Sequence, residues 1–552
     1  MNHQLAFLFR VFFASLSLNV ALSGTELVAQ SALETADVIY RDIGTWSDHL
    51  PYSHAQEAVY CGKTSTPVGN DGFWAVRVEN ALFLVLPDGS IQTISKVNGM
   101  SGSNPSALAW DVQGQMLVVG YASGVIDFFS NEGVRLFTMS DIKDSNLIGD
   151  KTIHKLVPAV STDPDRIYAA CGFGIVVINP REFDVRDTWF IEGQQELRSC
   201  HGLQFHEGQI VVWTDAGIFE ADQDHPFLSA PDAWTRWDDI PLETGDYRHV
   251  IFHPNGQPIV HRKTGTPEQP DELWWKSNGV WVPLPQWEGS QVYDITAGSI
   301  SSTPGDWIMA IADYQSIHLF NSGFEPIQLD YTADGVPLRA RHMVFHHREI
   351  EDPSGPSYAF EDLFIANQEE GLLQLDITGA EMDDHWSPSG PPTSLVRCID
   401  AWNDQMWVAS GGVDETWTSM YHKYGLYGLD GTRWQWIPPA EGENDIAGIN
   451  DVMVVSIDPT NPNHAFFGTW EEGLIEVLDG TLIETYNTTN STLQSADFGG
   501  SPRIGVGGVD FDAWGNLWFT NAYVSEPLQV RLTDGTFIAM AIGNAMGTNG
   551  WM

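Results

Sequence analysis

Two short glycine motifs contain residue types that could do chemistry. The motif "GMSG", from Gly99 to Gly102, resembles the start of a nucleophile elbow, in which a Ser lies between glycines on a sharp turn from a strand to a helix. It lacks the second Gly of that pattern, and strand-like segments flank it on both sides. The motif "CGFGIVV", from Cys171 to Val177, has Gly-x-Gly but neither the third Gly nor the helix that a dinucleotide site requires. We interpret both motifs as turns between strands.

A histidine-rich stretch, "RHMVFHHREIEDP", offers ligand types for a metal ion, since His342, His346 and His347 precede Glu349 and Glu351. Histidines at the end of a strand are more often solvated or hydrogen-bonded than bound to a metal. Carboxylates are abundant in the chain, but no pair stands out as the acid and base of a glycosidase. We assign no catalytic, metal-binding or cofactor-binding residue, and we expect a protein that is not an enzyme.

The same stretch is the densest group of basic residues, because Arg339, Arg341 and Arg348 lie among its histidines. It could bind an anion, but our interpretation is a solvated loop between two repeats. The acidic residues that these charges would offset are Glu349, Glu351 and Asp352. The ligand-binding residues stay unknown from the sequence.

The segment "DELWWKSNGVWVPLPQW" contains Trp274, Trp275, Trp281 and Trp287. Alternation along a strand would point some of these rings outward, where flat aromatic faces could stack on sugar rings. Packing between neighbouring repeats is the interpretation we favour. We therefore do not assign these residues to a site.

A repeated pattern of short strands must position all of these residues. Each unit has an apolar strand, a turn centred on Asp or Gly, a β-branched or aromatic strand, and a Gly turn into a third strand. The spacing of the units is roughly 46 residues as far as Leu338 and roughly 55 residues after it. Ten such units begin near Glu57, Ser106, Ile153, Cys200, Tyr247, Val292, Leu338, Ser394, Ile449 and Ile504.

A period of about 40 to 50 residues with about four strands per unit is typical of a β-propeller. One small sheet cannot bury both of its faces alone, whereas sheets stacked around an axis cover each other and leave only short edges. Bulky residues in the second strands, among them Trp213, Trp407 and Trp518, would fill the space between neighbouring sheets. The sequence therefore predicts an all-β chain of tandem β-propellers.

Ten units are too many for one ring, since propellers usually close with about four to eight blades. We predict two rings of seven blades, the second incomplete in this chain, with the boundary between residues 325 and 395. We assign residues 31–337 to the first propeller and residues 338–552 to the second. The seventh blade of the first ring comes either from the unit at Leu338 or from chain that returns later.

The first 30 residues have the layout of a secretory signal peptide, in which Arg10 precedes an apolar run that ends at Leu22. The run is short and broken by polar residues, which disfavours a membrane anchor. No later segment is apolar enough to span a bilayer. We expect an exported chain without a transmembrane segment in its mature form.

The chain is strongly acidic, with 26 Lys and Arg, 73 Asp and Glu and a formal net charge of −47. Such a surface repels nucleic acid and anionic lipid head groups, so we expect no nucleic-acid partner and ascribe the charge to solubility. The cysteines are too few and too scattered for a disulfide framework or a Cys-x-x-Cys metal site. We interpret Cys61, Cys171, Cys200 and Cys398 as buried thiols, while one long-range disulfide stays open.

Four segments near the N-terminus resemble the PorZ family, a surface component of the type IX secretion system of Bacteroidetes. They are "IGTWSDHLPYSHAQEAVYCG", "ISKVNGMSGSNPSALAWDVQGQMLVVGYASGVIDFF", "SDIKDSNLIGDKTIHKL" and "YAACGFGIVVINPREFDVRDTWFI", and their order and spacing fit over residues 43–191. The resemblance implies two seven-bladed propellers and a β-sandwich secretion-signal domain on the outer face of the outer membrane. It also implies an accessory protein that works with the sortase PorU and binds the anionic lipopolysaccharide that PorU attaches to cargo proteins.

The length departs from this plan. Fourteen blades need about 650 residues or more, so we expect a chain truncated at its C-terminus that lacks the β-sandwich. The resemblance supplies no binding motif that can be assigned to individual residues.

The units also resemble the periplasmic sensor propellers of Bacteroidetes hybrid two-component regulators, as in "GVDFDAWGNLWFTNAY". Glycan sensing in the periplasm is therefore the alternative function. A sensor would continue into a transmembrane helix and a kinase domain, whereas a PorZ protein would continue into a β-sandwich. A propeller hydrolase or lyase would instead need an acid and a base in the central channel of one ring.

Overall fold

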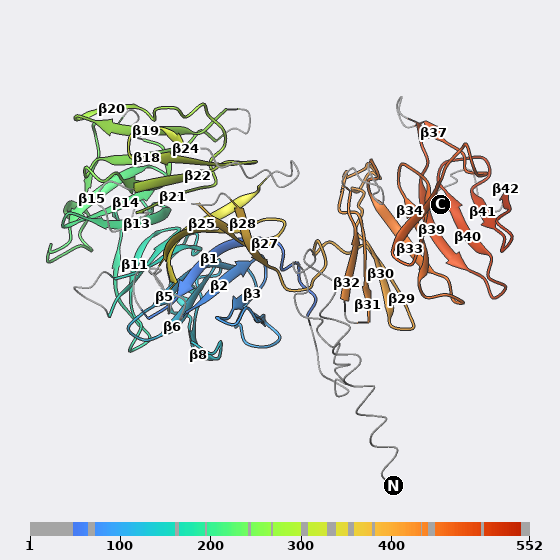
Figure 1. The fold of residues 1–552 in the computed structure, drawn as a ribbon, viewed down its shortest axis with the longest axis horizontal. Coiled ribbons are helices and arrows are strands. Elements are labelled where there is room, and N and C mark those ends of the chain that lie inside the picture. Colours follow the sequence, from blue (N-terminus) through green and yellow to red (C-terminus); the bar gives the residue numbers. More distant parts are fainter. Residues whose placement is uncertain are drawn as a thin grey trace, which may run out of the picture. The chain divides into compact units, whose positions relative to one another are not determined.

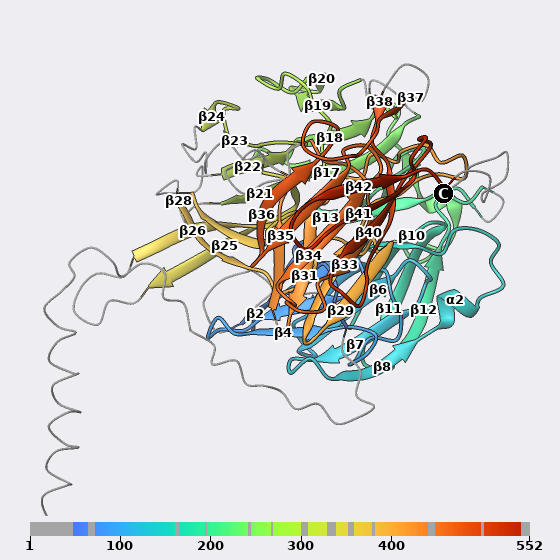
Figure 2. The same cartoon turned by 90° about the vertical axis from the view of Figure 1, so that its right-hand side faces the viewer.

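The computed structural model describes residues 48–63, 72–159, 165–193, 196–240, 244–265, 269–299, 307–327, 338–350, 358–377, 381–431, 433–439, 448–497 and 502–542. The expected signal peptide, residues 1–30, lies outside them. The described residues are almost entirely in strands and turns, which confirms the all-β prediction. Their helices are the four-residue α2 (Asp141–Asp144), marked in Figure 2, and the 3₁₀ helix η1 (Pro231–Ala233). Neither is long and apolar enough to cross a membrane.

Four-stranded antiparallel sheets follow one another along the chain, and neighbouring strands in each sheet are consecutive in the sequence (Figure 1). The first sheet contains β1 (Ala55–Cys61), β2 (Phe73–Val78), β3 (Leu82–Val85) and β4 (Ile91–Ile94). The second contains β5 (Pro105–Asp111), β6 (Met116–Tyr121), β7 (Ile126–Ser130) and β8 (Arg135–Met139). The third contains β9 (Ile153–Pro158), β10 (Ile167–Cys171), β11 (Gly174–Asn179) and β12 (Asp184–Trp189).

The next four sheets continue the same order. The fourth contains β13 (Cys200–His206), β14 (Gln209–Thr214), β15 (Gly217–Asp222) and β16 (Thr235–Arg236). The fifth contains β17 (Asp246–Phe252), β18 (Pro258–Lys263), β19 (Glu272–Ser277) and β20 (Val280–Pro283). The sixth contains β21 (Asp294–Ser299), β22 (Trp307–Ala312), β23 (Ile317–Asn321) and β24 (Pro326–Ile327). The seventh contains β25 (Ala340–Ile350), β26 (Tyr358–Asn367), β27 (Gly371–Asp376) and β28 (Glu381–Trp386).

Three further four-stranded sheets and one short ladder complete the described strands. The eighth sheet contains β29 (Cys398–Trp402), β30 (Gln405–Ala409), β31 (Leu426–Asp430) and β32 (Arg433–Ile437). The ninth contains β33 (Val452–Ile457), β34 (His464–Thr469), β35 (Leu474–Leu478) and β36 (Thr481–Tyr486). The tenth contains β39 (Val506–Phe511), β40 (Leu517–Asn521), β41 (Leu528–Arg531) and β42 (Phe537–Met540). The ladder pairs β37 (Ala496–Asp497) with β38 (Pro502–Arg503).

The first seven sheets form one closed ring. The first strand of each sheet contacts the first strand of the next, from β1 and β5 to β21 and β25, and β25 in turn contacts β1. This closing contact has its own apolar core, in which Trp74 and Val76 of β2 pack with Phe364 and Ala366 of β26. The unit that begins near Leu338 is therefore the seventh blade, one of the two alternatives that the sequence left open.

The expected division of the chain at residue 337 falls between β24 and β25. These strands belong to sheets that share an apolar core, in which Ile308 and Leu319 of the sixth sheet pack with Leu363 and Leu373 of the seventh. On these contacts we propose that the boundary between the rings lies after Trp386, inside the predicted window of residues 325–395. Residues 31–337 would then lack the last blade of the first propeller.

The repeated glycines have a steric cause that Gly174 and Gly371 illustrate. Each begins the third strand of its sheet with a positive φ, of 151° and 85° respectively. A Cβ atom there would lie 2.4 Å from the carbonyl oxygen of Trp189 or Trp386, at the end of the fourth strand. Only Gly lets the two backbones approach this closely. In these two sheets the turn into the third strand therefore requires a glycine.

The last three sheets form a second row, because β29, β33 and β39 lie side by side. One apolar core joins the eighth sheet to the ninth and a second core joins the ninth to the tenth. Strand β29 differs from the first strands of the closed ring, since Ile399 and Trp402 are 51% and 47% exposed. Strand β29 of the second row therefore exposes large apolar side chains, whereas the described residues in the first strands of the closed ring do not.

All four cysteines are unpaired, with Cys61, Cys171 and Cys200 buried and Cys398 half-buried. Burial raises the pKa of the Cys171 thiol, which keeps it protonated and unreactive. The interpretation of these residues as core thiols holds for three of the four.

Candidate functional site

The glycine motifs are turns between strands, as predicted. Gly99 and Gly102 lie between β4 and β5, where the backbone N–H of Ser101 donates to the buried carboxylate of Asp127 at 2.8 Å. The Gly-x-Gly after Cys171 connects β10 to β11. Neither motif is followed by the helix that a nucleophile elbow or a dinucleotide site needs.

The tryptophan-rich segment packs between neighbouring sheets. Trp275 is buried against Phe324 of the sixth sheet, with ring centroids 4.8 Å apart. Trp287 packs in the same core, while Trp274 and Trp281 pack on the core shared with the fourth sheet. The contacts agree with the packing interpretation of these rings.

Strand β25 carries most of the histidine-rich basic stretch, and the side chains of this stretch contact different neighbours. Arg339 is paired with Glu369 at 2.8 Å, whereas the Arg341 guanidinium lies 4.0 Å from the ring centroid of Tyr293. The positive charges thus contact different elements and do not converge on one pocket.

The histidines of this strand diverge in the same way. His346 faces the first sheet, and His342 lies close enough to Asp294 of the sixth sheet to influence its ionisation. His347 is half-buried. Side chains of Arg348 and Glu349, and the whole of Glu351 and Asp352, lie outside the described part of the structure. No cluster of three or more His, Cys, Asp or Glu among the described residues could hold a metal ion.

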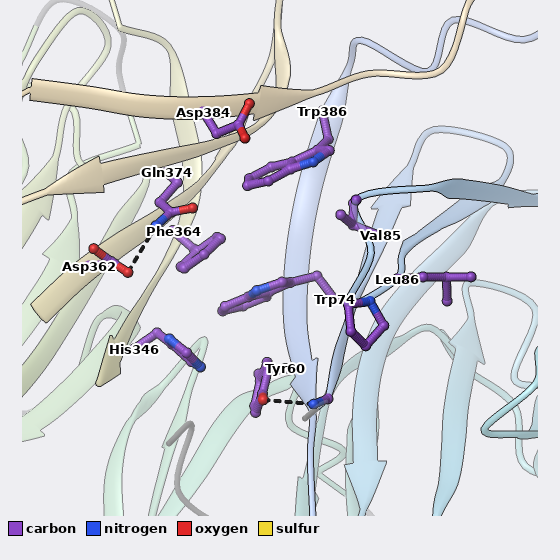
Figure 3. Close-up of a pocket in the computed structure, with 13 residues that line it drawn as sticks. Tyr60, Trp74, Val85, Leu86, His346, Asp362, Phe364, Gln374, Asp384 and Trp386 are labelled. Carbon is purple, nitrogen blue, oxygen red and sulfur yellow. Dashed lines mark hydrogen bonds between the residues drawn. The ribbon is translucent and has the colours of Figure 1, made fainter. Parts of the chain in front are cut away.

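His346 lines a cleft of about 360 Å³ between the first and seventh sheets (Figure 3). Its wall is a stack of aromatic rings, in which Trp74 lies on Phe364 with centroids 4.0 Å apart and an interplanar angle of 24°. Trp386 extends the stack at 6.2 Å from Phe364, and Tyr60 contacts the His346 ring at 4.5 Å. Figure 3 shows these rings in successive layers, contributed by β1, β2, β25, β26 and β28.

Polar groups lie on one side of this stack. Asp362 is fully buried and accepts a hydrogen bond of 2.9 Å from the Gln374 amide, while Asp384 is exposed at the rim. The described lining residues include no Ser, Thr, Cys or Lys that could act as a nucleophile. The cleft therefore offers a flat apolar wall and a few hydrogen-bonding groups, an arrangement common to ligand-binding sites.

A second polar feature surrounds the axis of the first ring. A β-bulge lies near the start of the first strand in every sheet of this ring except the sixth. A bulge turns one extra side chain out of the regular alternation. The residues in these bulges are all polar, namely Gln56, Ser106, His154, His201, Arg248 and Arg341. We call these residues the polar belt, together with the charged side chains that lie beside them. Those side chains belong to Glu57, Arg77, Lys155, Asp246 and Asp294.

Contacts in the polar belt run from sheet to sheet. The Ser106 hydroxyl donates to the carbonyl oxygen of Ile153 in the next sheet at 2.7 Å. The rings of His154 and His201 have centroids 5.4 Å apart, and Arg248 lies 3.4 Å from Nδ1 of His201. These contacts connect the second to the fifth sheet through polar groups alone.

Two ionisable groups of the belt show how burial and neighbouring charges act on it. Burial and the neighbouring His201 lower the pKa of His154 to about 4. Burial opposes ionisation of Asp294, yet His342, His249 and Lys155 together lower its pKa to about 2. At neutral pH the His154 ring is therefore neutral and the Asp294 carboxylate is charged. The cations are Arg77, Lys155, Arg248 and Arg341, and the anions are Glu57, Asp246 and Asp294.

Sequence reasoning missed the cleft and the polar belt, because both depend on contacts between different sheets. Trp74 and Phe364 belong to the first and seventh sheets and meet only because the ring closes. The polar belt did leave a signal, since His154, His201 and Arg248 recur at a constant spacing in consecutive units. A polar residue that recurs next to the first residue of an apolar strand indicates a bulge.

The match to a family model lies within the first ring, whereas the structural matches extend over most of the chain. Residues 76–235 match the family model of the N-terminal β-propeller domain of PorZ from the type IX secretion system. The structure of PorZ from Porphyromonas gingivalis, described as an essential bacterial surface component of that system, has a TM-score of 0.65 and 20% sequence identity to this chain. The match covers 90% of this chain and 60% of PorZ, so the chain spans about three fifths of the length of that protein.

Two extracellular sensor domains from B. thetaiotaomicron also match, with TM-scores too low to support an argument. That of a putative one-component system has 9% identity over 90% of this chain and 67% of its own, with a TM-score of 0.38. That of a putative hybrid two-component system has 11% identity over 88% and 63%, with a TM-score of 0.28. No curated protein sequence matches this chain. The predicted resemblance to the PorZ family is confirmed by the family match, and residues 76–235 of the first β-propeller carry it.

Proposed function

We propose that this protein is a non-enzymatic accessory component of the type IX secretion system at the cell surface, associated with the outer membrane. In this role it binds anionic lipopolysaccharide and delivers it to the sortase PorU for attachment to cargo proteins. The observation that supports the proposal is the match of residues 76–235 to the N-terminal propeller domain of PorZ. The flat aromatic wall of the cleft, with hydrogen-bonding groups beside it, supports a role in binding.

An anionic ligand needs a local site in a chain whose net charge is −47, because the overall field repels it. The polar belt is our candidate for that site. Asp246 and Glu57 are paired with Arg248 and Arg77, while Lys155 makes no ion pair with another described residue. Arg341 rests on an aromatic ring instead of a carboxylate. Lys155 and Arg341 are therefore belt cations without a carboxylate in ion-pair contact among the described residues.

The test is binding of purified anionic lipopolysaccharide to the whole chain at two salt concentrations. We expect the variant with Lys155→Ala, Arg248→Ala and Arg341→Ala to bind at least tenfold more weakly. The wild type should weaken with salt, because exposed charges are screened. A control with the same change in charge is Lys96→Ala, Arg135→Ala and Arg186→Ala, at exposed positions, and should bind as the wild type does.

A parallel variant, Arg339→Ala, Arg341→Ala and Arg348→Ala, tests the basic stretch predicted from the sequence. Full affinity in this variant would exclude that stretch as the site and leave the polar belt without Arg341. A chain that binds neither lipopolysaccharide nor PorU would count against the proposed function itself and would favour the sensor alternative.

A further inference from the structure

The segment 411–425, which connects β30 to β31, presents aromatic side chains at the surface. Val413 pairs with Ser419, so the segment is a hairpin. Trp417, Met420 and Tyr421 are 48%, 51% and 54% exposed. Large apolar side chains that gather on a surface mark a binding site more often than isolated ones do. We call this segment the aromatic hairpin.

The backbone of this region is strained at aromatic residues. Trp417, Tyr421 and Tyr523 have φ values of 63°, 58° and 59°, in the left-handed region that bulky side chains rarely occupy. Tyr523 follows β40 in the tenth sheet and contacts the same tryptophan, Trp470, that supports the aromatic hairpin. Such conformations are energetically unfavourable, persist only where the surrounding structure enforces them, and cluster at ligand-binding or active sites.

A buried carboxylate holds the hairpin in this conformation. Asp451, which is fully buried, accepts hydrogen bonds from the backbone N–H groups of Gly412, Tyr421 and His422 at 3.1, 2.8 and 3.0 Å. Both ends of the hairpin are thus attached to one side chain of the ninth sheet. A surface that is already ordered loses little conformational entropy when a ligand binds.

Trp417 is half exposed although a buried side chain supports one side of its ring. Its ring packs on Trp470, with centroids 5.6 Å apart, and the Trp470 indole N–H donates to the Trp417 carbonyl oxygen at 3.1 Å. Trp470 itself is only 4% exposed. One side of the Trp417 ring is therefore supported from below while much of the ring faces solvent.

Polar groups lie beside this aromatic surface. The Arg503 guanidinium is paired with Glu471 at 3.0 Å and donates to the Tyr421 hydroxyl at 3.3 Å. The Ser419 hydroxyl donates to the same carboxylate. The remaining charged groups nearby are mostly acidic, namely Asp414 and Glu415 in the hairpin and Glu472 next to Glu471.

We propose that the aromatic hairpin binds a neutral carbohydrate, with a sugar ring stacked on Trp417 and its hydroxyl groups bonded to Glu471 and Arg503. The face of an indole is electron-rich and attracts the C–H groups of a sugar ring. Carboxylate and guanidinium groups supply strong acceptors and donors for sugar hydroxyls. The acidic surroundings disfavour an anionic saccharide. This site lies in the second row of sheets and does not depend on the function proposed above.

The experiment titrates the whole chain with neutral oligosaccharides of mannose, glucose, galactose and N-acetylglucosamine by isothermal calorimetry. We expect at least one of them to bind, and Trp417→Ala to weaken it at least tenfold. Trp514→Ala removes a tryptophan that is 81% exposed in a different turn and should leave the affinity within twofold of the wild type.

A second substitution separates binding from folding. Trp417→Gly removes the ring but accepts the positive φ, so the thermal midpoint should be kept or raised while binding is lost. The proposal is wrong if no neutral oligosaccharide binds, if Trp417→Ala binds normally, or if a phosphorylated oligosaccharide binds more tightly than its neutral parent. The Lys155→Ala, Arg248→Ala and Arg341→Ala variant should bind the neutral oligosaccharide normally, which keeps this result distinct from the lipopolysaccharide test.

Discussion

The closed ring and the second row are built from the same kind of sheet but bury different amounts of it. In the ring, Trp74 is only 6% exposed because the seventh sheet covers it. In the second row, Trp402 of β29 is 47% exposed and Ile399 is 51% exposed. The strand order within each four-stranded sheet is the same in both regions. A blade is therefore specified by its own sequence, but its stability depends on which neighbour covers each face.

The difference has a physical cause in how apolar burial scales. The hydrophobic contribution is about 25 cal/mol for each Å² of apolar surface removed from water. A sheet inside the ring gains it on both faces, whereas an end sheet of a row gains it on one. Ring closure thus stabilises the first and seventh sheets in a way that no local interaction within either sheet provides.

The largest predicted effect is a loss of stability at Trp74, which lies in the contact that closes the first ring. Trp74→Ala should lower the free energy of unfolding by about 3 to 5 kcal/mol, because it leaves a cavity against Phe364. Trp402→Ala removes the same side chain from an exposed position and should change it by less than about 1 kcal/mol. Chemical denaturation followed by tryptophan fluorescence measures both. Equal losses in the two variants would show that burial by a neighbouring sheet does not govern stability.

The second prediction concerns a strongly held part of the second row. Asp451→Ala leaves three backbone N–H groups of the aromatic hairpin without their acceptor and should cost about 2 to 3 kcal/mol. Amide hydrogen exchange should speed up at residues 412–422 and remain unchanged in the first ring. Asp414→Ala, at an exposed turn of the same hairpin, should cost less than about 1 kcal/mol. Unchanged protection in Asp451→Ala would contradict the anchoring role of this carboxylate.

The smallest predicted effect is a dependence on pH that belongs to the second row. Burial, together with Glu471 and Asp451, raises the pKa of Glu472 from its ordinary 4.5 to about 7. Between these values the folded state keeps a proton that the unfolded state has lost, so the free energy of unfolding falls as the pH rises. The loss should be about 1 kcal/mol after allowance for solvent screening.

The matched control for this effect is Glu472→Gln, which cannot ionise. Its unfolding free energy should not show this fall between pH 4.5 and 7, and at pH 8 it should exceed that of the wild type. Denaturation curves at several pH values give the comparison. A variant with the same slope as the wild type would assign the pH dependence to another group.

Repeats and turns were predictable because they depend on local chemistry. The predicted first strands near Ile153 and Cys200 coincide with the starts of β9 and β13, and the unit near Ile504 begins two residues before β39. The cleft could not be predicted, because Trp74 and Phe364 give no sign in the sequence that they will stack. The basic stretch was visible as a cluster, but only the contacts between sheets decided that its side chains have different neighbours.

The sequence by itself determined the β-sheet unit, its repetition and the resemblance of the first propeller to the PorZ family, because turn glycines and alternating strands act over a few residues. Only the tertiary structure decided that the unit at Leu338 closes the first ring and that Ile399 and Trp402 of β29 are exposed. It also decided which polar residues share the belt and which aromatic residues share the hairpin surface. These outcomes depend on contacts between sheets that are distant in the chain, and such contacts form where the most apolar surface is removed from water.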